Sequence, residues 1–185
     1  MDTSVVIDTD LNDIPVLETI PKTIDLSINT IQFAHPILNA SGCWSLHEKQ
    51  LDELYDSKLA GVVSKTATLF SKKGNPDPSY YYDEDNKISY NCKGLPNLGY
   101  NYYKRLSTKY SQKPYILSLA YDTFDKLKLI LLDYSCNNNC DEYNSKKLVE
   151  LNLSCPNTAN VIIGYSLYLM DELFIFLKRL HLPNI

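Results

Sequence analysis

The sequence predicts an α/β protein with a parallel sheet, and two observations support this fold class. Short apolar runs with the alternation of β-strands are interleaved with longer segments of helical spacing, and the order strand then helix repeats about four times. A chain of 185 residues, 44% of them hydrophobic, is also long enough for one ordinary domain with a sizeable core. Functional sites in such proteins gather at the carboxyl ends of the strands, so candidate residues are sought there.

Residues 1–21 are expected to form a flexible acidic extension. Five acidic residues precede the first basic residue, Lys22, which is the opposite of an Arg-rich, acid-poor transit peptide. Residues 22–185 are expected to form one domain, because their number suits a single ordinary domain.

The elements of this domain are predicted from local patterns. Alternating residues on both sides of Asn29 predict a short β-hairpin over 23–33. Ser45 followed by Glu48 matches a capping box, and leucines at helical spacing predict a helix that ends before Gly61. Further strands are expected at 37–42, 61–65, 115–120 and 149–154, and further helices at about 102–111, 124–134 and 171–180.

Two segments are predicted to be irregular. Residues 71–100 contain Gly- and Pro-rich stretches and a tyrosine run, and so long an irregular segment in a compact domain is usually functional. Residues 136–144 are expected to form a polar, low-complexity loop. Its cysteines, Cys136 and Cys140, are not accompanied by a second pair of ligands, so no metal site is predicted.

Composition and charge exclude several classes of protein. The formal net charge is -4, the isoelectric point is near 5.3 and no basic stripe stands out, so neither nucleic acid nor an anionic membrane is expected as a partner. The longest apolar stretch, residues 161–170, is only about half a membrane span. A soluble protein is therefore expected. The five cysteines show no regular spacing and no signal peptide precedes them, which predicts a reducing compartment, the cytoplasm.

The segment 151–157, Leu-Asn-Leu-Ser-Cys-Pro-Asn, carries the clearest candidate for chemistry. Its residues alternate like a strand until Pro156, which prevents further ladder pairing, so Cys155 is expected just past a strand end. A thiol there can act as a base or nucleophile, and the amides of Asn152 and Asn157 suit a planar ligand with amide edges of its own. The alternative is a buried cysteine flanked by asparagines that cap a turn.

Two further candidates occupy equivalent positions. Lys65 ends the strand predicted at 61–65, and Ser41 lies near the end of the strand predicted at 37–42. In a parallel sheet these strand ends meet at one edge, where Cys155 is also expected. Three chemically apt residues at three such ends favour a functional site over a purely structural role for Cys155.

These residues lie in segments that resemble class 1 dihydroorotate dehydrogenases. The turn 94–99, Gly-Leu-Pro-Asn-Leu-Gly, followed by Tyr102 and Tyr103, and a cysteine rather than a serine as the base are similar to the cytosolic, fumarate-using class 1A branch. The resemblance covers about residues 23–180, which correspond to the first half of a family member. Its motifs occur in the family's order at 39–42, 64–69, 74–76, 91, 94–99 and 150–157.

The resemblance implies an FMN-bearing (β/α)8 TIM barrel that oxidises (S)-dihydroorotate to orotate in de novo pyrimidine (UMP) biosynthesis, with fumarate as the electron acceptor. It also implies a homodimer for the complete protein. Cys155 would take the C5 proton of the substrate while the C6 hydride passes to the flavin, and Lys65 would contact both FMN and substrate. The other residues implied to line FMN are Ala40, Ser41, Thr66 and Asn152. Those implied to hold the substrate, besides Lys65, are Asn91, Asn152 and Asn157, with the backbone of Gly94 and Leu95.

The sequence departs from the family pattern at several positions. Lys93 stands where the family usually has methionine, and Ser79 stands where an arginine usually follows Asn-Pro-x-Pro. Residues 158–164 replace the Pro-Gly-Lys-Pro loop that carries the base over the site. The family's second flavin lysine, its glycine-rich phosphate loops and its fifth strand have no counterpart in the 185 residues.

Two expectations follow from the resemblance and these departures. The expected fold is the first half of a (β/α)8 barrel, with about four βα units after a short hairpin, truncated before strand 5. The expected function is that of the family. The alternative is a truncated, non-catalytic remnant that is inactive alone or acts only by association with another chain.

Overall fold

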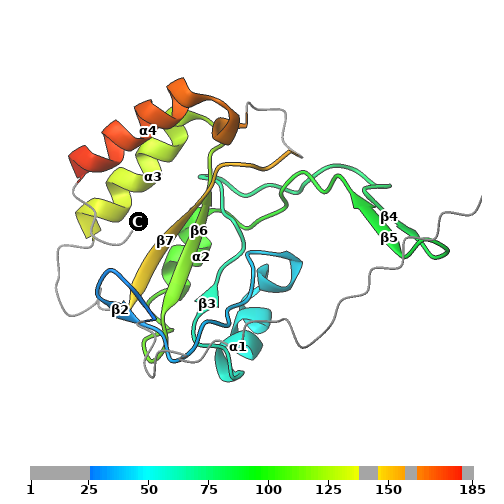
Figure 1. The fold of residues 1–185 in the computed structure, drawn as a ribbon, viewed down its shortest axis with the longest axis horizontal. Coiled ribbons are helices and arrows are strands. Elements are labelled where there is room, and N and C mark those ends of the chain that lie inside the picture. Colours follow the sequence, from blue (N-terminus) through cyan, green and yellow to red (C-terminus); the bar gives the residue numbers. More distant parts are fainter. Residues whose placement is uncertain (1–25, 138–145, 157–161, 181–185) are drawn as a thin grey trace, which may run out of the picture.

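The computed structural model describes residues 26–137, 146–156 and 162–180. The predicted acidic extension lies outside the described residues and stays a prediction. Residues 136 and 137 of the loop predicted at 136–144 are helical instead, and its remaining residues lie outside the described ranges. The described residues form an α/β structure around a three-stranded parallel sheet, which confirms the predicted α/β class (Figure 1). None of the helices in these ranges is long and apolar enough to span a membrane.

The parallel sheet has the order β3 (Val62–Val63), β6 (Tyr115–Ala120), β7 (Lys147–Asn152), so each strand lies beside the one before it in the sheet. All six residues of β6 are buried, because the central strand of a parallel sheet is covered on both faces. The strand predicted at 115–120 is confirmed with the same ends. Those predicted at 61–65 and 149–154 are confirmed with shifted ends.

The described helices are α1 (Glu48–Asp56), α2 (Tyr100–Leu106), α3 (Phe124–Asn137) and α4 (Leu167–Leu180), with short 3-10 helices η2 (Cys43–Ser45) and η3 (Ile163–Tyr165). Figure 1 shows α3 and α4 side by side, next to the sheet. The rings of Phe124 and Phe176 meet edge to face between these two helices, with centroids 6.0 Å apart. Aromatic packing therefore joins the last two described helices.

Tyrosines build much of the core between α2 and the sheet. Tyr100, Tyr103 and Tyr115 are among the largest fully buried side chains. A buried tyrosine needs a partner for its hydroxyl. Tyr115 donates to the backbone oxygen of Tyr103 at 3.1 Å, and Tyr100 donates to Asp133 Oδ2 at 2.8 Å. These bonds fix α2 against β6 and α3.

Two helices begin earlier than predicted. The helix expected at 102–111 is α2, which starts directly after Gly99, whose φ of 87° is a conformation that only glycine adopts easily. The helix expected from residue 171 is α4, which starts at Leu167. Ser166 precedes it, and its hydroxyl accepts a hydrogen bond from the backbone N–H of Leu169 at 3.4 Å, the contact of a helix N-cap.

The strand predicted at 37–42 is wrong, because this segment forms no strand. Asn39 lies beside β3 instead and bonds to it through its side chain: Nδ2 donates to the Val63 oxygen at 2.8 Å, and Oδ1 accepts from the Val63 N–H at 2.9 Å. A side-chain amide offers the same donor and acceptor as a peptide group. The described parallel sheet therefore has three strands rather than four.

The capping box predicted from Ser45 and Glu48 is also wrong. Ser45 belongs to η2, is buried, and donates its hydroxyl to the Gly42 oxygen at 3.1 Å. His47 is the N-cap of α1, and Gln50 Oε1 accepts from the His47 N–H at 3.0 Å. The reciprocal glutamine contact thus lies two residues further along than the pattern indicated.

Two antiparallel hairpins complete the described fold. The first joins β1 (Ser27–Ile28) to β2 (Ile31–Gln32) and confirms the predicted hairpin, with Asn29 at a φ of 53°. The second joins β4 (Tyr80–Asp83) to β5 (Ile88–Asn91), so the irregular segment predicted at 71–100 is partly wrong. Figure 1 shows this second hairpin extending away from the parallel sheet.

Candidate functional site

Lys65 lies two residues after the end of β3, at the carboxyl end of the sheet. Its Nζ donates to the Ser41 backbone oxygen at 3.4 Å, and its side chain is partly buried. Burial lowers the pKa of Lys65 below its ordinary value of 10.5, while negative charge on Cys43 and Cys155 acts in the opposite direction. The Lys65 ammonium therefore lies within electrostatic range of both thiols.

A chain of hydrogen bonds runs from Ser41 across the sheet. Thr66 Oγ1 donates to Ser41 Oγ at 3.1 Å and lies 3.0 Å from Ser118 Oγ. Ser118 in turn donates to Glu150 Oε1 at 2.6 Å, in register across β6 and β7. Thr66 and Ser118 are both buried, so this chain connects the predicted flavin-lining hydroxyls to a carboxylate through the interior.

Sequence reasoning missed Ser118 and Glu150. The sequence contains one feature that singles out each residue. Ser118 is the only polar side chain with a hydrogen-bonding hydroxyl in the interior of the apolar run 116–120, and Glu150 alternates with apolar residues in β7. Neither signal reveals that the two residues face each other, because that depends on the register of two strands more than thirty residues apart.

Cys155 lies three residues after the end of β7 and is partly exposed. Asn152 is the last residue of β7, opposite Ala120, and its Oδ1 accepts from the Ser154 backbone N–H at 3.2 Å. The Nδ2 group of this amide carries two N–H donors that the bond to Ser154 does not use. Asn157 lies outside the described residues, and its predicted role stays a prediction.

The predicted substrate turn, which contains Gly94 and Leu95, is hydrogen-bonded to the same end of the sheet. Gly94 and Leu95 have φ values of 70° and 57°, and Leu95 is buried. Asn97 holds this turn from within: its Nδ2 donates to the Leu95 oxygen at 3.0 Å, and its Oδ1 accepts from the Thr68 N–H at 3.2 Å. Thr68 follows Lys65 by three residues, so the turn and the lysine belong to one connected unit.

Gly94 also shows why a side chain is excluded from this turn. A Cβ atom added to it would lie 2.4 Å from Asn75 Oδ1, and its positive φ disfavours other residues in any case. The backbone N–H of Asn75 also donates to the Lys93 oxygen at 2.9 Å. The backbone of the predicted substrate turn is thus closely packed against segment 74–75.

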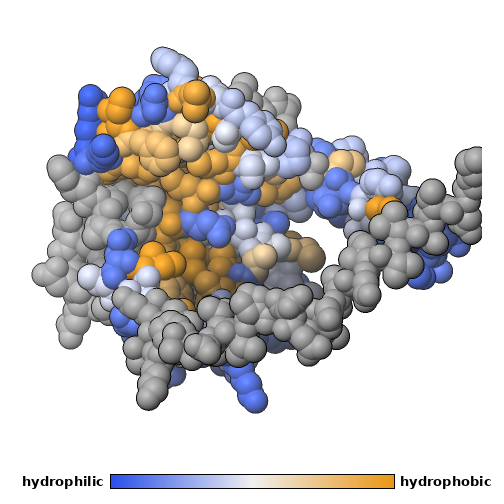
Figure 2. All heavy atoms as spheres, in the orientation of Figure 1, coloured by the Kyte–Doolittle hydropathy of each residue, from blue (hydrophilic) through white to orange (hydrophobic). Residues whose placement is uncertain are grey.

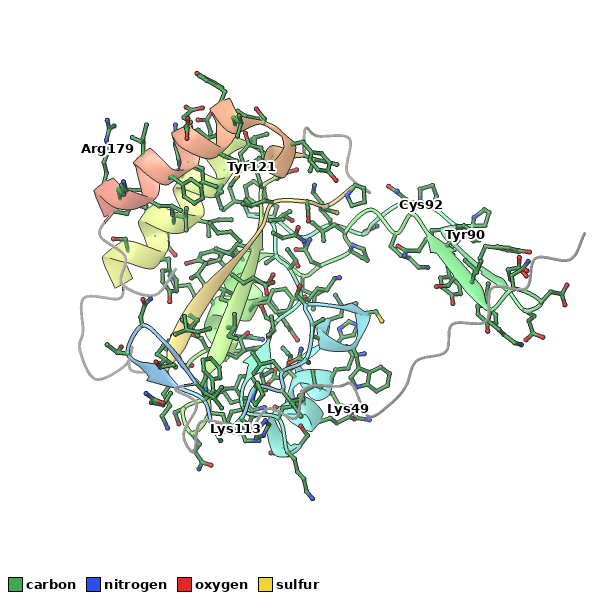
Figure 3. All side chains as sticks on the ribbon, in the orientation of Figure 1. Lys49, Tyr90, Cys92, Lys113, Tyr121 and Arg179 are labelled. Carbon is green, nitrogen blue, oxygen red and sulfur yellow. The ribbon has the colours of Figure 1, made fainter. Side chains whose placement is uncertain are left out.

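Two other predicted residues are placed differently. Ala40 is exposed, next to Ser41. Asn91 is exposed at the end of β5, paired in register with Tyr80. Figure 3 shows its neighbours Tyr90 and Cys92 on the hairpin, away from the parallel sheet. The structure therefore brings Ser41, Lys65, Thr66 and Cys155 into one neighbourhood, and does not bring Asn91 there.

The two substitutions in the family pattern, Lys93 and Ser79, contact each other. Lys93 Nζ donates to Ser79 Oγ at 2.9 Å, and Ser79 Oγ donates to Asp77 Oδ1 at 2.6 Å. Ser79 is buried, and the Lys93 ammonium also lies 3.9 Å from Asp77. The cation that departs from the pattern is thus held in a cluster at the base of the hairpin.

An ion pair ties the loop after Lys65 to the end of β6. Lys72 Nζ donates to Asp122 Oδ1 at 2.7 Å, and Lys126 donates to Asp122 Oδ2 at 2.5 Å. Asp122 is buried, so its charge is compensated by two lysines from different segments. In the described part of the chain, no three His, Cys, Asp or Glu side chains gather as metal ligands. Cys140 and the side chain of Cys136 lie outside that part.

The chain is similar in sequence to known dihydroorotate dehydrogenases. The family model for dihydroorotate dehydrogenase matches residues 23–174. A dihydroorotate dehydrogenase (fumarate) of Lachancea kluyveri is 30% identical over 167 residues, which cover 83% of this chain and 50% of the relative. Dihydroorotate dehydrogenase A (fumarate) of Lactococcus lactis is 36% identical over 135 residues, which cover 68% of this chain and 40% of the relative.

A third relative shows the same pattern of coverage. The dihydroorotate dehydrogenase (fumarate) of Saccharomyces mikatae is 34% identical over 157 residues, which cover 80% of this chain and 48% of the relative. The chain thus spans about half the length of the curated relatives it matches. With a family model that matches most of its residues, the chain belongs to the dihydroorotate dehydrogenase family.

Proposed function

We propose that this chain supplies the base and the flavin-facing side chains of an enzyme that oxidises (S)-dihydroorotate to orotate. In this proposal FMN is the cofactor, fumarate is the electron acceptor and the reaction serves de novo pyrimidine synthesis in the cytoplasm. The observation that carries the proposal is the neighbourhood of Lys65 and Cys155 at the carboxyl ends of β3 and β7. The reaction itself comes from the names of the relatives, dihydroorotate dehydrogenase (fumarate).

The proposed active form is a complete (β/α)8 barrel. The order β3-β6-β7, in which each strand is added beside the previous one, is the order of strands in such a barrel. Three parallel strands do not close, so the described sheet would be one part of the barrel. The relatives are about twice as long as the matched segment, which is consistent with further βα units. The complete enzyme is proposed to be a homodimer.

The donors around the carboxyl end of β3 suit the ring of FMN. Ser41 and Thr66 offer hydroxyls, Lys65 offers an ammonium, and Ala40 is exposed beside them. A flavin ring carries carbonyl and N–H groups that such donors and acceptors match, and a cation suits the negative charge of the reduced ring. When bound, FMN would accept the hydride from C6 of dihydroorotate.

Residues of this chain would carry out the proton transfer. The thiolate of Cys155 would take the proton from C5 of dihydroorotate as the hydride leaves C6, so that the C5–C6 double bond of orotate forms. The positive charge of Lys65 lies within electrostatic range of that sulfur. Lys65 would also attract the substrate carboxylate, and the Asn152 Nδ2 group would donate to a ring carbonyl.

The experiment uses the chain co-expressed with the part of the Lachancea kluyveri relative that it does not match. Orotate formation is measured with FMN, dihydroorotate and fumarate, for the chain alone and for the combined protein. We expect activity in the combined protein, and a loss of at least about 10²-fold in Cys155→Ala. Cys92→Ala, an exposed cysteine on the hairpin, is the matched control and should keep the rate. An unchanged rate in Cys155→Ala would refute the assigned base.

A second candidate is a non-catalytic member of the family that acts only by association with another chain. Two observations favour it. Lys93 brings a cation next to the predicted substrate turn. Asn91 ends β5, in the hairpin that extends away from the parallel sheet (Figure 1). Combined protein that binds FMN and yet forms no orotate would support this candidate. Replacement of Lys93 by methionine and Ser79 by arginine, the residues usual in the family, should then restore orotate formation.

A further inference from the structure

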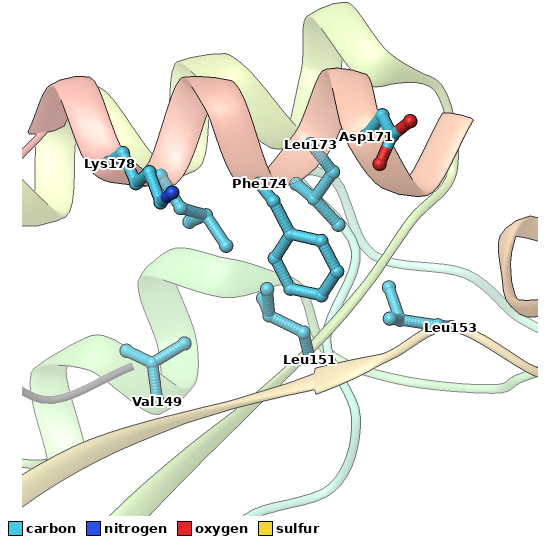
Figure 4. A pocket seen from close by; sticks show the side chains of 8 residues that line it. Val149, Leu151, Leu153, Asp171, Leu173, Phe174 and Lys178 are labelled. Carbon is cyan, nitrogen blue, oxygen red and sulfur yellow. The ribbon is translucent and has the colours of Figure 1, made fainter. Parts of the chain in front are cut away.

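Polar side chains gather where the β4–β5 hairpin joins the predicted substrate turn. The hydrophobic groove between β7 and α4 lies elsewhere in the fold, and none of its lining residues belongs to this junction (Figure 4). Figure 2 shows hydrophilic residues where the hairpin meets the rest of the described fold. Three polar residues form a junction cluster there: Lys93, directly before Gly94 of the turn, with Ser79 and Asp77 just before β4.

The Lys93 ammonium is directed toward the segment before β4. Its Nζ donates to Ser79 Oγ at 2.9 Å and lies 3.9 Å from Asp77 Oδ1. Ser79 is only 3% exposed, and its hydroxyl donates to Asp77 Oδ1 at 2.6 Å, so its oxygen is available to accept from Lys93. The bond from Ser79 and the charge of Lys93 hold the pKa of Asp77 below its ordinary value of 3.8. A cation therefore meets an anion through a buried hydroxyl.

The backbone of Lys93 is held by the same part of the chain. Its oxygen accepts from the Asn75 N–H at 2.9 Å, and the oxygen of Cys92 accepts from Asn75 Nδ2 at 2.6 Å. The Cys92 N–H donates to the Ser79 oxygen at 2.9 Å. A Cβ atom added to Gly74 would lie 2.4 Å from the Lys93 oxygen, so the two segments are in close contact. The side chain and the backbone of Lys93 thus both join the turn to segment 74–79.

We infer that Lys93 is a positioning residue for the substrate turn: its ammonium fixes segment 77–79 against the turn and so determines where the backbone of Gly94 and Leu95 lies. Leu95 has a φ of 57°, a conformation that a leucine keeps only when its surroundings hold it. Lys93 acts through the turn, because its ammonium is engaged within the junction cluster. The inference rests on the proposed function, in which the backbone of Gly94 and Leu95 holds the substrate.

Amide hydrogen exchange of the chain alone, without flavin or substrate, tests this role independently of catalysis. The N–H groups of Asn75 and Cys92 report on it, because both donate across the junction. Lys93→Met should speed their exchange about five- to tenfold, the effect of losing one charged hydrogen bond from a side chain that is 48% exposed. Lys93→Arg, which can also donate to Ser79, should restore the protection.

Comparison variants separate this local effect from a general one. Lys73→Met is the matched control, because Lys73 is exposed and lies outside the junction cluster, and it should leave the exchange unchanged. The Ala67 N–H, which donates to the Ser118 oxygen in the sheet, should exchange at one rate in every variant. Ser79→Ala should resemble Lys93→Met, and the double variant should be no worse than either, because both substitutions remove the same contact.

The same variants are then assayed for orotate formation in the combined protein. Lys93→Met should raise the KM for dihydroorotate about five- to tenfold and keep the turnover at saturation, because a displaced turn weakens substrate binding alone. Equal exchange in Lys93→Met and Lys73→Met would overturn the inference, as would a lower KM in Lys93→Met. Faster exchange in Lys93→Met together with a combined protein that makes no orotate would overturn the proposed reaction and leave the role of Lys93 at the junction standing.

Discussion

The side-chain amide of Asn39 makes both hydrogen bonds with the backbone of Val63 that a neighbouring strand would otherwise make. The two distances are 2.8 Å to the Val63 oxygen and 2.9 Å from the Val63 N–H. Two residues later, Ser41 meets Lys65 through its carbonyl and Thr66 through its hydroxyl. Asn39 therefore fixes the segment that carries Ser41 against the end of β3.

Asn39→Ala should destabilise the fold by about 2 kcal/mol, because it leaves the N–H and C=O of Val63 without these partners in a partly buried place. Chemical unfolding in urea measures the change. Asn86→Ala removes an amide from the exposed hairpin turn and should change stability by no more than about 0.5 kcal/mol. Equal effects of the two substitutions would show that the bonds to Val63 contribute little.

Ser118→Ala should also destabilise the fold, by about 1–3 kcal/mol, because it removes the buried hydroxyl between Thr66 and Glu150. Thr66 keeps its bond to Ser41, so the effect is on stability first. Ser111→Ala is the control, since Ser111 is exposed. Thermal unfolding of the two variants at the same midpoint would contradict a stabilising role for this hydroxyl chain.

Asp122 should contribute stability that depends on pH. Burial alone would raise its pKa, but hydrogen bonds from Lys126 and Lys72 outweigh burial and hold the pKa below the ordinary value of 3.8. A carboxylate that is more acidic in the folded state stabilises the fold at every pH above its ordinary pKa. That contribution is lost as the pH falls through the lower, folded value.

Asp122→Asn should therefore lower the unfolding free energy at neutral pH by about 2 kcal/mol, after allowance for partial exposure of the lysines. It should also flatten the fall in stability below pH 4. Urea unfolding between pH 2.5 and about 7 measures both effects. Parallel stability curves for the variant and the unsubstituted chain would contradict this account of the ion pair.

Elements with strong local patterns were predictable, and those decided by distant partners were not. The strand 115–120 was predicted with its observed ends because its apolar run, interrupted by Ser118 alone, is typical of a buried strand. The segment 37–42 is less apolar, and the side chain of Asn39 within it bonds to the backbone of Val63. A sequence pattern does not reveal which partner a polar side chain will find.

The β4–β5 hairpin illustrates a second limit. All of its strand residues except the partly exposed Asp83 are exposed, and β4 carries three consecutive tyrosines, so the alternation of buried and exposed residues that marks a strand is missing. Stacking of Tyr81 on Tyr90, with ring centroids 6.3 Å apart, accompanies the pairing instead. The positions of Lys65 and Cys155 past strand ends were predictable from the sequence, and their roles stay predictions. The contact of Glu150 with Ser118 was missed because it depends on cross-strand register.

The isolated chain should bind FMN weakly. The phosphate of FMN is expected to be held by the part of the family pattern that this chain does not match, and each lost charge-assisted hydrogen bond removes about 1.5–3 kcal/mol. A few such losses weaken binding by orders of magnitude. Titration followed by flavin fluorescence measures the affinity. Dissociation constants in the micromolar range or below would contradict the prediction and place the phosphate site within this chain.

The most direct test of the account is stopped-flow reduction of the flavin in the combined protein with Cys155→Ser. A serine hydroxyl is far less acidic than a thiol, whose pKa is about 8.5, so its deprotonated form is scarcer near neutral pH. We expect reduction by dihydroorotate to slow by about 10²–10⁴-fold at neutral pH, with a deficit that shrinks as the pH rises. Reduction at the unsubstituted rate across this pH range would assign the C5 proton to another group and leave Cys155 as a packed thiol.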